Sequence, residues 1–565
     1  MKVRSWSGSW VAALLCVLTT GLTVTLAGCS SSGGGPAPTP AATGANDVNP
    51  RPADQLRDGG DLRWPIDSLP DNFNRNQFSG SQVQTKQITD AMLPVLYTDT
   101  ADGGTARNAD FLTAADLTSA VPQVVTYALN PKATWSDGKP ITWRDFEAQW
   151  KALNATNPAY LISSRTGYED IASVAPGTDD HHVVVTFART FAEWESLFSP
   201  LYPASTNADP TLFNTGWINK IPVTAGPFAL DAIDPTAKTV TLRRDPKWWG
   251  RPAKLDRIIF KVFERTATAD ALANNEIDFY PIGSSVDLLK RAQSVPGAAI
   301  RQSAERLYNQ ITFNGAPGAI LSDLKLRQAI AKGIDRTAIA RRMVGAIVPN
   351  VTQLGNHIYA YGSKDYRDNS GVLPYDRGAA NRELDTLGWV RAAPGAMRSR
   401  NGQPLRLRLL EATPNPIGQQ IDRTVLDQLA QLGVTVTIQP VPIQQASSQY
   451  KTGNFDLVTF AWQNTSTPFS GTQGLYAEPR GDDVQQNYGR IYDPQVSALY
   501  EQGLRELNDT RRADLGNQAD RLIWQDVHHL PLYPATGAYA VRSTLANFGA
   551  PGFADIDYID AGYLK

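Results

Sequence analysis

Cys29 is the residue whose surroundings define its chemistry most sharply. It ends the run Leu26-Ala27-Gly28-Cys29, which follows a short basic region and an apolar stretch over residues 10–26. This order is typical of a secretory signal peptide that is cleaved before the cysteine, and the freed thiol is a suitable acceptor for a thioether-linked diacylglycerol. Several acyl chains such as palmitate exceed the single-chain threshold for stable anchoring. We predict a signal peptide over residues 1–28 and a lipid anchor at Cys29; the alternative is an ordinary leader with an incidental cysteine.

The segment over residues 29–55 is predicted to be a flexible tether. It is dominated by Ser, Gly, Pro, Ala and Thr and has almost no large apolar residue, so it cannot bury a core. Its root-mean-square reach is roughly 25–30 Å. The apolar stretch ahead of Cys29 is too short and too weakly flanked for a permanent membrane span. We therefore expect a globular body held at the outer face of the cell membrane.

Metal and enzyme chemistry are poorly supported. The only cysteines are Cys16 and Cys29, so the mature body has no thiol for a disulfide, a zinc cluster or a nucleophile. The five histidines occur as two adjacent pairs, at 181–182 and 528–529, and one single residue, at 357. The side chains of adjacent residues diverge instead of facing one metal. The sequence contains no Gly-x-Ser-x-Gly, phosphate-loop or His-Glu-x-x-His pattern. We predict no enzyme, no metal and no cofactor.

The net charge of the mature protein limits its possible partners, and its length limits the number of domains. Loss of Lys2 and Arg4 with the leader leaves 51 basic against 55 acidic residues, a balance that argues against nucleic acid as a partner. More than 500 residues follow the tether, enough for two or three domains. The 13 Trp, 20 Tyr and 18 Phe residues can serve cores and ligand clefts alike.

Strands and helices alternate along the body. Apolar alternation predicts strands over residues 59–64, 124–129, 183–187, 239–243, 255–263 and 276–280. Helices are predicted over residues 143–153, where Thr142 and Asp145 form a capping pair, and over residues 266–274. This mixture indicates an α/β protein.

The second half contains a strand–helix–strand unit. Residues 405–410, 417–432 and 434–438 read as strand, helix and strand, with Gly433 ending the helix, which is typical of a partly parallel sheet. Ser322 is expected to cap one long helix over residues 322–343. A helix at 444–451 leads into a strand at 454–458, as the helix before 276–280 does, and this echo suggests two α/β lobes. Residues 493–527 are predicted helical and residues 533–542 a strand.

Several short blocks of the sequence are weak signals when taken one by one. They are Trp135-Ser136-Asp137-Gly138-Lys139-Pro140, Ala225-Gly226-Pro227-Phe228, Arg244-Asp245-Pro246 with Trp248-Trp249, Asn275-Glu276-Ile277-Asp278, Phe313-Asn314, and Leu326-Arg327-Gln328-Ala329-Ile330 leading to Ile334-Asp335-Arg336. In this order and spacing, the chain resembles the extracellular solute-binding proteins of the peptide/nickel class (family 5), the large receptors of ABC importers. Asp and Gly in such blocks favour turns. We interpret the blocks as marks of the scaffold and not of the ligand.

The resemblance implies a type II periplasmic-binding-protein fold with two hinged lobes and an extra subdomain. The expected lobe I comprises residues 56–90, 223–308 and 536–565, and its extra subdomain comprises residues 91–222. Residues 309–535 form the expected lobe II. A ligand that touches both lobes favours the closed state.

The resemblance also places a ligand loop over residues 460–469. In peptide-binding members the peptide pairs with strand edges, and an aspartate in this loop holds its ammonium group. Here Asn464 stands at that position, and an amide offers a dipole where a buried cation needs a full charge. We predict that Trp462 stacks on the ligand and that Gln463, Asn464 and Thr465 form hydrogen bonds with it. The alternative is a polar surface loop.

A second wall is expected from the first half of the chain. Asn72, Phe73 and Asn74 stand where the family commonly has a turn close to the ligand, although a purely turn-forming role is an equal alternative. Tyr168 and the polar run 163–166 are further candidates from the extra subdomain.

Three functions remain open at this point. The first is a lipid-anchored, monomeric receptor that captures short peptides, or another small solute, for an ABC permease. The second keeps the fold and binds a neutral ligand such as a glycan or a glycolipid headgroup, which Asn464 and Trp462 favour. The third is an envelope scaffold or regulator that does not take part in transport.

Overall fold

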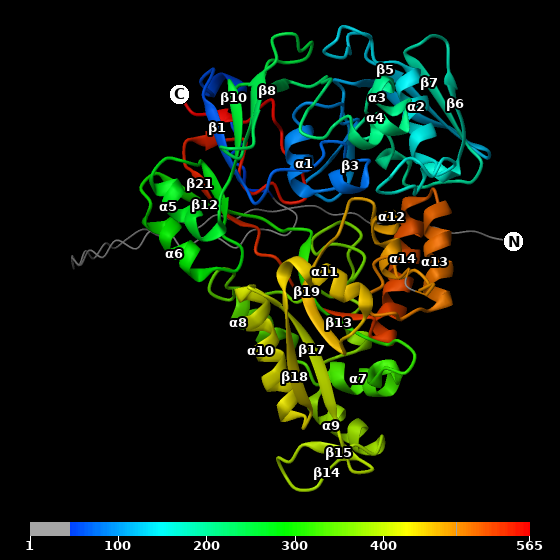
Figure 1. The fold of residues 1–565 in the computed structure, drawn as a ribbon, viewed down its shortest axis with the longest axis vertical. Helices are drawn as coiled ribbons and strands as arrows, with labels where there is room; N and C mark the ends of the chain where they lie inside the picture. The colour runs from blue at the N-terminus through cyan, green and yellow to red at the C-terminus, as the bar shows by residue number, and fades with distance from the viewer. Residues whose placement is uncertain (1–45, 482) are drawn as a thin grey trace, which may run out of the picture. The chain divides into compact units, whose positions relative to one another are not determined.

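The computed structural model describes residues 46–481 and 483–565 (Figure 1). The predicted signal peptide, Cys29 and most of the predicted tether lie outside the described residues. No helix in the described ranges is long and apolar enough to cross a bilayer. The backbone N–H of Asp47 donates to the carbonyl of Ala550 at 2.8 Å. The chain is therefore bonded to the body from Asp47 onward, ahead of the predicted boundary at residue 55.

The first sheet contains four strands. In spatial order these are β1 (Asp61–Ile66), β10 (Arg257–Val262), β9 (Thr239–Arg244) and β8 (Phe228–Asp234). The pairing of β1 with β10 is parallel and the other two pairings are antiparallel. Alternate side chains of β1 are buried, as its period of two requires, and Trp64 packs against Phe260 with ring centroids 5.2 Å apart. The strands predicted at these positions are confirmed.

A second, antiparallel sheet lies in the segment predicted as the extra subdomain. Its strands are β4 (Leu112–Ala120), β5 (Gln123–Leu129), β7 (His182–Phe187) and β6 (Ile171–Pro176). The accompanying helix α2 (Trp143–Leu153) has the predicted bounds. Thr142 accepts a hydrogen bond from Arg144 N at 3.3 Å, and Asp145 accepts one from Thr142 N at 2.9 Å. This capping box satisfies donors that the first turn leaves free.

A five-stranded mixed sheet forms the centre of the second half. Its strands are, in order, β18 (Thr435–Pro442), β17 (Arg406–Thr413), β19 (Leu457–Gln463), β13 (Leu307–Phe313) and β20 (His529–Pro534). Strands β17 and β18 are parallel and are joined by α10 (Pro416–Gln431). The predicted strand–helix–strand unit is therefore confirmed. Apolar residues of β17 and α10 share one core, and α10 lies along the sheet (Figure 1).

The prediction of one long helix over residues 322–343 is wrong. The structure has two helices, α7 (Leu324–Lys332) and α8 (Arg336–Val344). Asp323, not Ser322, caps α7, and Asp335 caps α8. Gly333 lies between the helices, where a Cβ atom would come within 2.0 Å of Leu432. Both helices bury apolar faces in the same core. The apolar residues therefore keep their helical spacing across the break, and the sequence pattern does not reveal it.

The segment predicted as one strand over residues 533–542 is also divided. Strand β20 belongs to the five-stranded sheet, whereas β21 (Ala538–Arg542) pairs with β11 (Phe279–Pro281) and β12 (Ala298–Gln302). Residues 535–537 thus pass between two sheets, and residues 303–306, between β12 and β13, do the same. Ser303 N donates to Gly537 O at 3.2 Å and Ala535 N to Leu307 O at 2.8 Å. The two crossing segments lie side by side, next to the predicted lobe boundaries at 308/309 and 535/536.

The remaining longer helices complete the layers around these sheets. They are α1 (Val83–Thr89), α5 (Thr268–Ala273), α6 (Val286–Ser294), α9 (Arg377–Thr386), α11 (Ile443–Thr452), α13 (Pro494–Arg505) and α14 (Asp509–Asp526). The predicted helices over 266–274 and 444–451 correspond to α5 and α11. The region predicted helical over residues 493–527 consists of α13 and α14.

The two halves repeat one local motif, as the sequence echo predicted. After α5, Asp278 accepts hydrogen bonds from the backbone N and the Nε of Arg63 at 2.7 and 3.0 Å. After α11, Asp456 accepts the same two bonds from Arg408 at 2.7 and 3.1 Å. In each half, an aspartate lies in the segment that follows a helix. Its carboxylate joins this segment to a neighbouring strand through two hydrogen bonds with one arginine.

Candidate functional site

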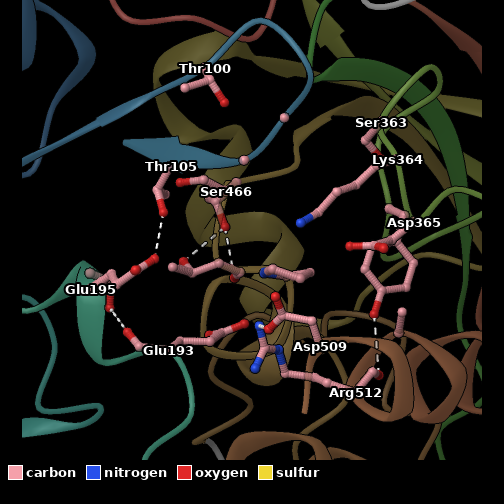
Figure 2. Close-up of a pocket in the computed structure, with 18 of the residues that line it drawn as sticks. Thr100, Thr105, Glu193, Glu195, Ser363, Lys364, Asp365, Ser466, Asp509 and Arg512 are labelled. Atoms are coloured by element: carbon pink, nitrogen blue, oxygen red, sulfur yellow. Dashed lines mark hydrogen bonds and ion pairs between the residues drawn. The ribbon is translucent and has the colours of Figure 1, made fainter. Parts of the chain in front are cut away.

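The candidate site is a cavity of about 800 Å³ (Figure 2). This volume lies in the range of about 300–1,000 Å³ typical of small-ligand pockets. One wall comes from residues 100–105 and 192–196. The other comes from residues 358–365, 465–468 and 507–513, and Arg306 of the first crossing segment also lines the cavity.

Aromatic packing and a hydrogen bond hold the residues of the first wall in place. It consists of the turn between β2 (Tyr97–Asp99) and β3 (Thr105–Arg107) and of the short helix η4 (Trp194–Ser196). The Trp194 ring packs edge-on against Tyr97 and Tyr127, with centroids 5.9 and 6.1 Å away. The Thr105 hydroxyl donates to Glu195 Oε2 at 2.6 Å. The Glu195 side chain is therefore fixed by its neighbours on both sides.

Glu193 joins the two walls. Its buried carboxylate accepts hydrogen bonds from Phe469 N at 2.9 Å, from Ser470 N at 2.8 Å and from the Ser470 hydroxyl. These donors lie in the first turn of α12 (Pro468–Thr472), where backbone N–H groups lack helical partners. Burial raises the pKa of Glu193, and the bonds from Ser470 and Phe469 oppose that change. Ala192 N also donates to Leu504 O at 2.7 Å, so two adjacent residues connect the walls.

The second wall rests on a buried polar network. His357 Nδ1 lies 2.6 Å from Asp520 Oδ1, and both side chains are fully buried. Asn356 Oδ1 accepts hydrogen bonds from Ile358 N and Tyr359 N at 2.9 and 2.8 Å. Because Asp520 belongs to α14, the network fixes the cavity-lining loop to that helix. The histidine thus has a positioning role for the loop.

Charged groups of both signs face the cavity. Arg306 lies 3.4 Å from Asp99, and its side chain is 9% exposed. Arg512 pairs with Asp509 at 2.6 Å. Burial raises the pKa of Asp365, and the charges of Lys364 and Arg512 oppose that change. Such a mixed lining suits a ligand that carries charges of its own.

The predicted ligand loop is only partly at this cavity. Thr465 lines it, together with Ser466, Thr467 and Pro468. Trp462 and Gln463 end strand β19, where Trp462 stacks on Tyr488 with centroids 5.8 Å apart. Asn464 is 2% exposed, and its backbone N donates to Arg306 O at 3.0 Å. These three residues are not among those that line the cavity.

The other predicted residues lie in the interior of the first half. Asn72 Nδ2 donates to Asn214 O and Asn74 Nδ2 to Phe213 O, both at 2.9 Å. Phe73, between them, is 1% exposed. The Tyr168 hydroxyl accepts a hydrogen bond from Phe198 N at 2.7 Å and lies 3.1 Å from Gln149 Nε2. None of these four side chains lines the cavity, and their ligand role stays a prediction.

Sequence reasoning missed Glu193, Glu195, Arg306 and Lys364. The run of residues 193–195 is a visible signal. It places a Trp, which is highly buried on average, between two Glu residues, which are almost never fully buried unless paired. For Arg306 and Lys364 the sequence offers no local pattern. Their role depends on segments that only the fold brings together.

Three of the scaffold blocks meet at a second, smaller cavity of about 180 Å³. It is lined by residues 134–138, 224–226 and 245–249. Ser136 N donates to Thr224 O at 2.7 Å, and Thr224 N donates to the Ser136 hydroxyl at 3.0 Å. This mutual bonding supports the interpretation of these blocks as structural corners.

Comparison with known proteins agrees with this architecture. Residues 112–483 match the model of bacterial extracellular solute-binding proteins, family 5 Middle. The oligopeptide-binding protein OppA of Mycobacterium tuberculosis is 40% identical over 576 residues, which cover 100% of this chain and 96% of OppA. The probable monoacyl phosphatidylinositol tetramannoside-binding protein LpqW of the same organism is 26% identical over 73% of this chain and 68% of LpqW.

Solved structures show the same fold. The periplasmic EDTA-binding protein EppA superposes with a TM-score of 0.84 at 25% identity, over 93% of this chain and 99% of EppA. The oligopeptide-binding protein AppA of Bacillus subtilis, in complex with a nonapeptide, gives a TM-score of 0.74 at 16% identity, over 90% of this chain and 100% of AppA. The chain therefore has the type II periplasmic-binding fold and belongs to the family 5 bacterial extracellular solute-binding proteins.

Proposed function

We propose that this protein is the substrate-binding component of an ABC importer, which captures short peptides in the 800 Å³ cavity and delivers them to a membrane permease. The observation that carries the proposal is the 40% identity to an oligopeptide-binding protein along the whole chain. The mixed charges of the cavity support it, because a peptide presents an ammonium group, a carboxylate and backbone hydrogen-bonding groups together.

The proposed mechanism needs binding and closure only. A ligand that contacts both cavity walls stabilises the arrangement in which the walls face each other. The paired segments 303–306 and 535–537 are the places where the chain passes between sheets, and we propose that they act as the hinge. No catalytic step, metal or cofactor forms part of the proposal. The protein acts as a monomer held at the outer face of the membrane through Cys29.

A second candidate ligand is neutral, such as a glycan or a glycolipid headgroup. Asn464 supplies no charge for a buried ammonium group. One relative is named as a probable binding protein for a phosphatidylinositol tetramannoside, a glycolipid whose sugars are neutral but whose phosphate is charged, and it therefore supports the glycolipid form of this candidate. A scaffold role without transport is the third candidate.

Native mass spectrometry of the protein purified from its own cells tests these candidates. We expect bound masses that fragment as short peptides, and calorimetric titration with trialanine to hexaalanine should then show saturable binding. A bound mass that fragments as a hexose series would support the second candidate instead. Absence of any bound mass, together with no heat from peptides or mannosides, would contradict both ligand proposals.

A further inference from the structure

We propose that Glu195 and Lys364 are the charged contacts that orient the ligand in this protein. Glu195, together with Thr105, binds the ammonium group of a peptide, and Lys364 on the facing wall binds its carboxylate. The inference rests on the proposed peptide-binding function and assigns an orientation to it. It also explains how the protein binds a cation although Asn464 replaces the expected aspartate.

The loop position expected to hold the ammonium group cannot supply a charge. Asn464 is 2% exposed, and within the described residues its Nδ2 atom has no hydrogen-bond partner. An amide nitrogen repels a cation, and a buried ammonium group without a counter-charge is costly. Asn464 also does not line the cavity, so the negative charge must come from the residues that do.

Most charged groups of the cavity are already engaged within the protein. Glu193 accepts bonds from α12, Asp509 pairs with Arg512, and Arg306 pairs with Asp99. Asp102 accepts bonds inside its own turn, from the Thr100 hydroxyl and from Gly104 N, and these bonds, together with the charge of Lys364, lower its pKa. These groups shape the cavity, but their charges are compensated or committed.

Glu195 differs from the other acids. Its Oε2 accepts the Thr105 hydroxyl at 2.6 Å, and across the described ranges no cationic side chain forms an ion pair with it. Asp365, the remaining acid, has Lys364 and Arg512 as charged neighbours. Glu195 is therefore the carboxylate best able to accept a charge-assisted hydrogen bond from an ammonium group.

The position of Glu195 is fixed before any ligand arrives. Its predecessor Trp194 is packed between Tyr97 and Tyr127, and Glu193 is bonded to Phe469 and Ser470. A carboxylate held in this way loses little conformational freedom on binding, which favours affinity.

Lys364 supplies the opposite charge. It lies on the facing wall, and its side chain extends into the cavity (Figure 2). Its ammonium group forms no hydrogen bond or ion pair with any described residue. A lysine is a compact point charge on a flexible stem, so it can follow the carboxylates of peptides that differ in length.

The two contacts together couple ligand orientation to closure. Glu195 belongs to the first wall and Lys364 to the second, so a zwitterionic ligand bridges the walls by its two ends. A ligand that lacks one charge would lose one of the bridging contacts.

Calorimetric titration with blocked peptides tests the assignment. The probes are trialanine, N-acetyl-trialanine and trialanine amide, against the wild type, Glu195→Gln and Lys364→Met. We expect Glu195→Gln to weaken trialanine and its amide about ten- to hundredfold and to leave the weaker binding of the acetylated peptide unchanged. Lys364→Met should weaken trialanine and the acetylated peptide by a similar factor and leave the amide unchanged.

Glu147→Gln is the control, because Glu147 does not line the cavity and pairs with Lys151 on α2 at 2.6 Å. It should change all three affinities by less than about threefold. Equal losses for free and blocked peptides in either variant, or no loss, would overturn the orientation while leaving peptide binding intact. Failure of the wild type to bind any of the peptides would overturn the proposed function and this inference together.

Discussion

His528 is a buried residue whose protonation makes stability depend on pH. Its Nε2 lies 3.0 Å from Asn487 Oδ1 and its Nδ1 lies 3.2 Å from His529 Nδ1. Burial, and next the charge of His357, lower the pKa of His528 to about 3, whereas an unfolded histidine has a pKa near 6.5. Between these values the unfolded chain binds more protons, so the free energy of unfolding falls as the pH falls, by at most about 1.4 kcal/mol per pH unit from this group.

We therefore expect the difference in Tm between the wild type and His528→Gln to change between pH 6.5 and 4, because only the wild type loses stability through this histidine. Burial raises the pKa of Asp422 to about 7 and that of Asp526 to about 6, and these two groups favour the folded state in acid equally in both proteins. Differential scanning calorimetry at four pH values measures both slopes. Parallel slopes for His528→Gln and the wild type would contradict the role of His528.

Cys29 carries the prediction that concerns the membrane. Cys29→Ser removes the only thiol that can accept the diacylglycerol, so we expect the variant to remain unprocessed or to be released from the cells. Fractionation of cells followed by intact-mass measurement checks this outcome. A Cys29→Ser protein that stays in the membrane fraction with an unchanged mature mass would refute the anchor.

At the scale of elements, the first turn of α12 is the contact through which Glu193 holds the cavity walls together. Glu193→Ala removes the carboxylate that accepts three hydrogen bonds from Phe469 and Ser470. Each charge-assisted hydrogen bond contributes about 1.5–3 kcal/mol at most. We expect the variant to have a larger radius of gyration without peptide and a weaker peptide affinity. Small-angle X-ray scattering with and without trialanine measures the first effect.

Glu147→Ala is a suitable control for this experiment. Glu147 pairs only with Lys151 on the surface of α2, at 2.6 Å, and exposed pairs of this type contribute about 0.3–0.5 kcal/mol. Its loss should leave the scattering unchanged. Identical scattering curves for Glu193→Ala and the wild type would show that Glu193 does not hold the walls.

The success of sequence prediction also differs from element to element. Helix α2 has the predicted bounds because its start is fixed by local hydrogen bonds of Thr142 and Asp145. These two residues are close together in the sequence and form a recognisable capping pattern. The break between α7 and α8 was not predicted, because apolar residues of both helices pack in one core and Gly333 does not interrupt the helical spacing of these residues. Likewise, β20 and β21 form one apolar run, and only their pairing partners separate them.

The candidate site was predicted less well than the fold for the same reason. Thr465, in the loop that the resemblance located, lines the cavity, and its contact with a ligand stays a prediction. Glu195 and Lys364 lie far apart in the sequence, and their meeting across a cavity depends on tertiary packing. No local spacing rule marks such a pair.

At the scale of the whole molecule, stability depends on burial without covalent cross-links. The sequence has no cysteine after Cys29, so no disulfide can constrain the folded body. We expect a reducing agent to leave the Tm unchanged within about 1 °C, measured by calorimetry on the mature protein. A decrease of several degrees would contradict the interpretation of both cysteines.

The pairing of the two ends of the described chain has a mechanical consequence. Asp47 is bonded to Ala550, Arg57 N donates to Tyr563 O at 2.9 Å, and Lys565 N donates to Gln55 O at 3.2 Å. Tension applied through a tether held at the membrane by Cys29 would therefore pass directly into the C-terminal segment, as shear across these backbone bonds. The crossing segments 303–306 and 535–537 are not part of these pairings, so such tension would load the paired ends of the chain before it reached the proposed hinge.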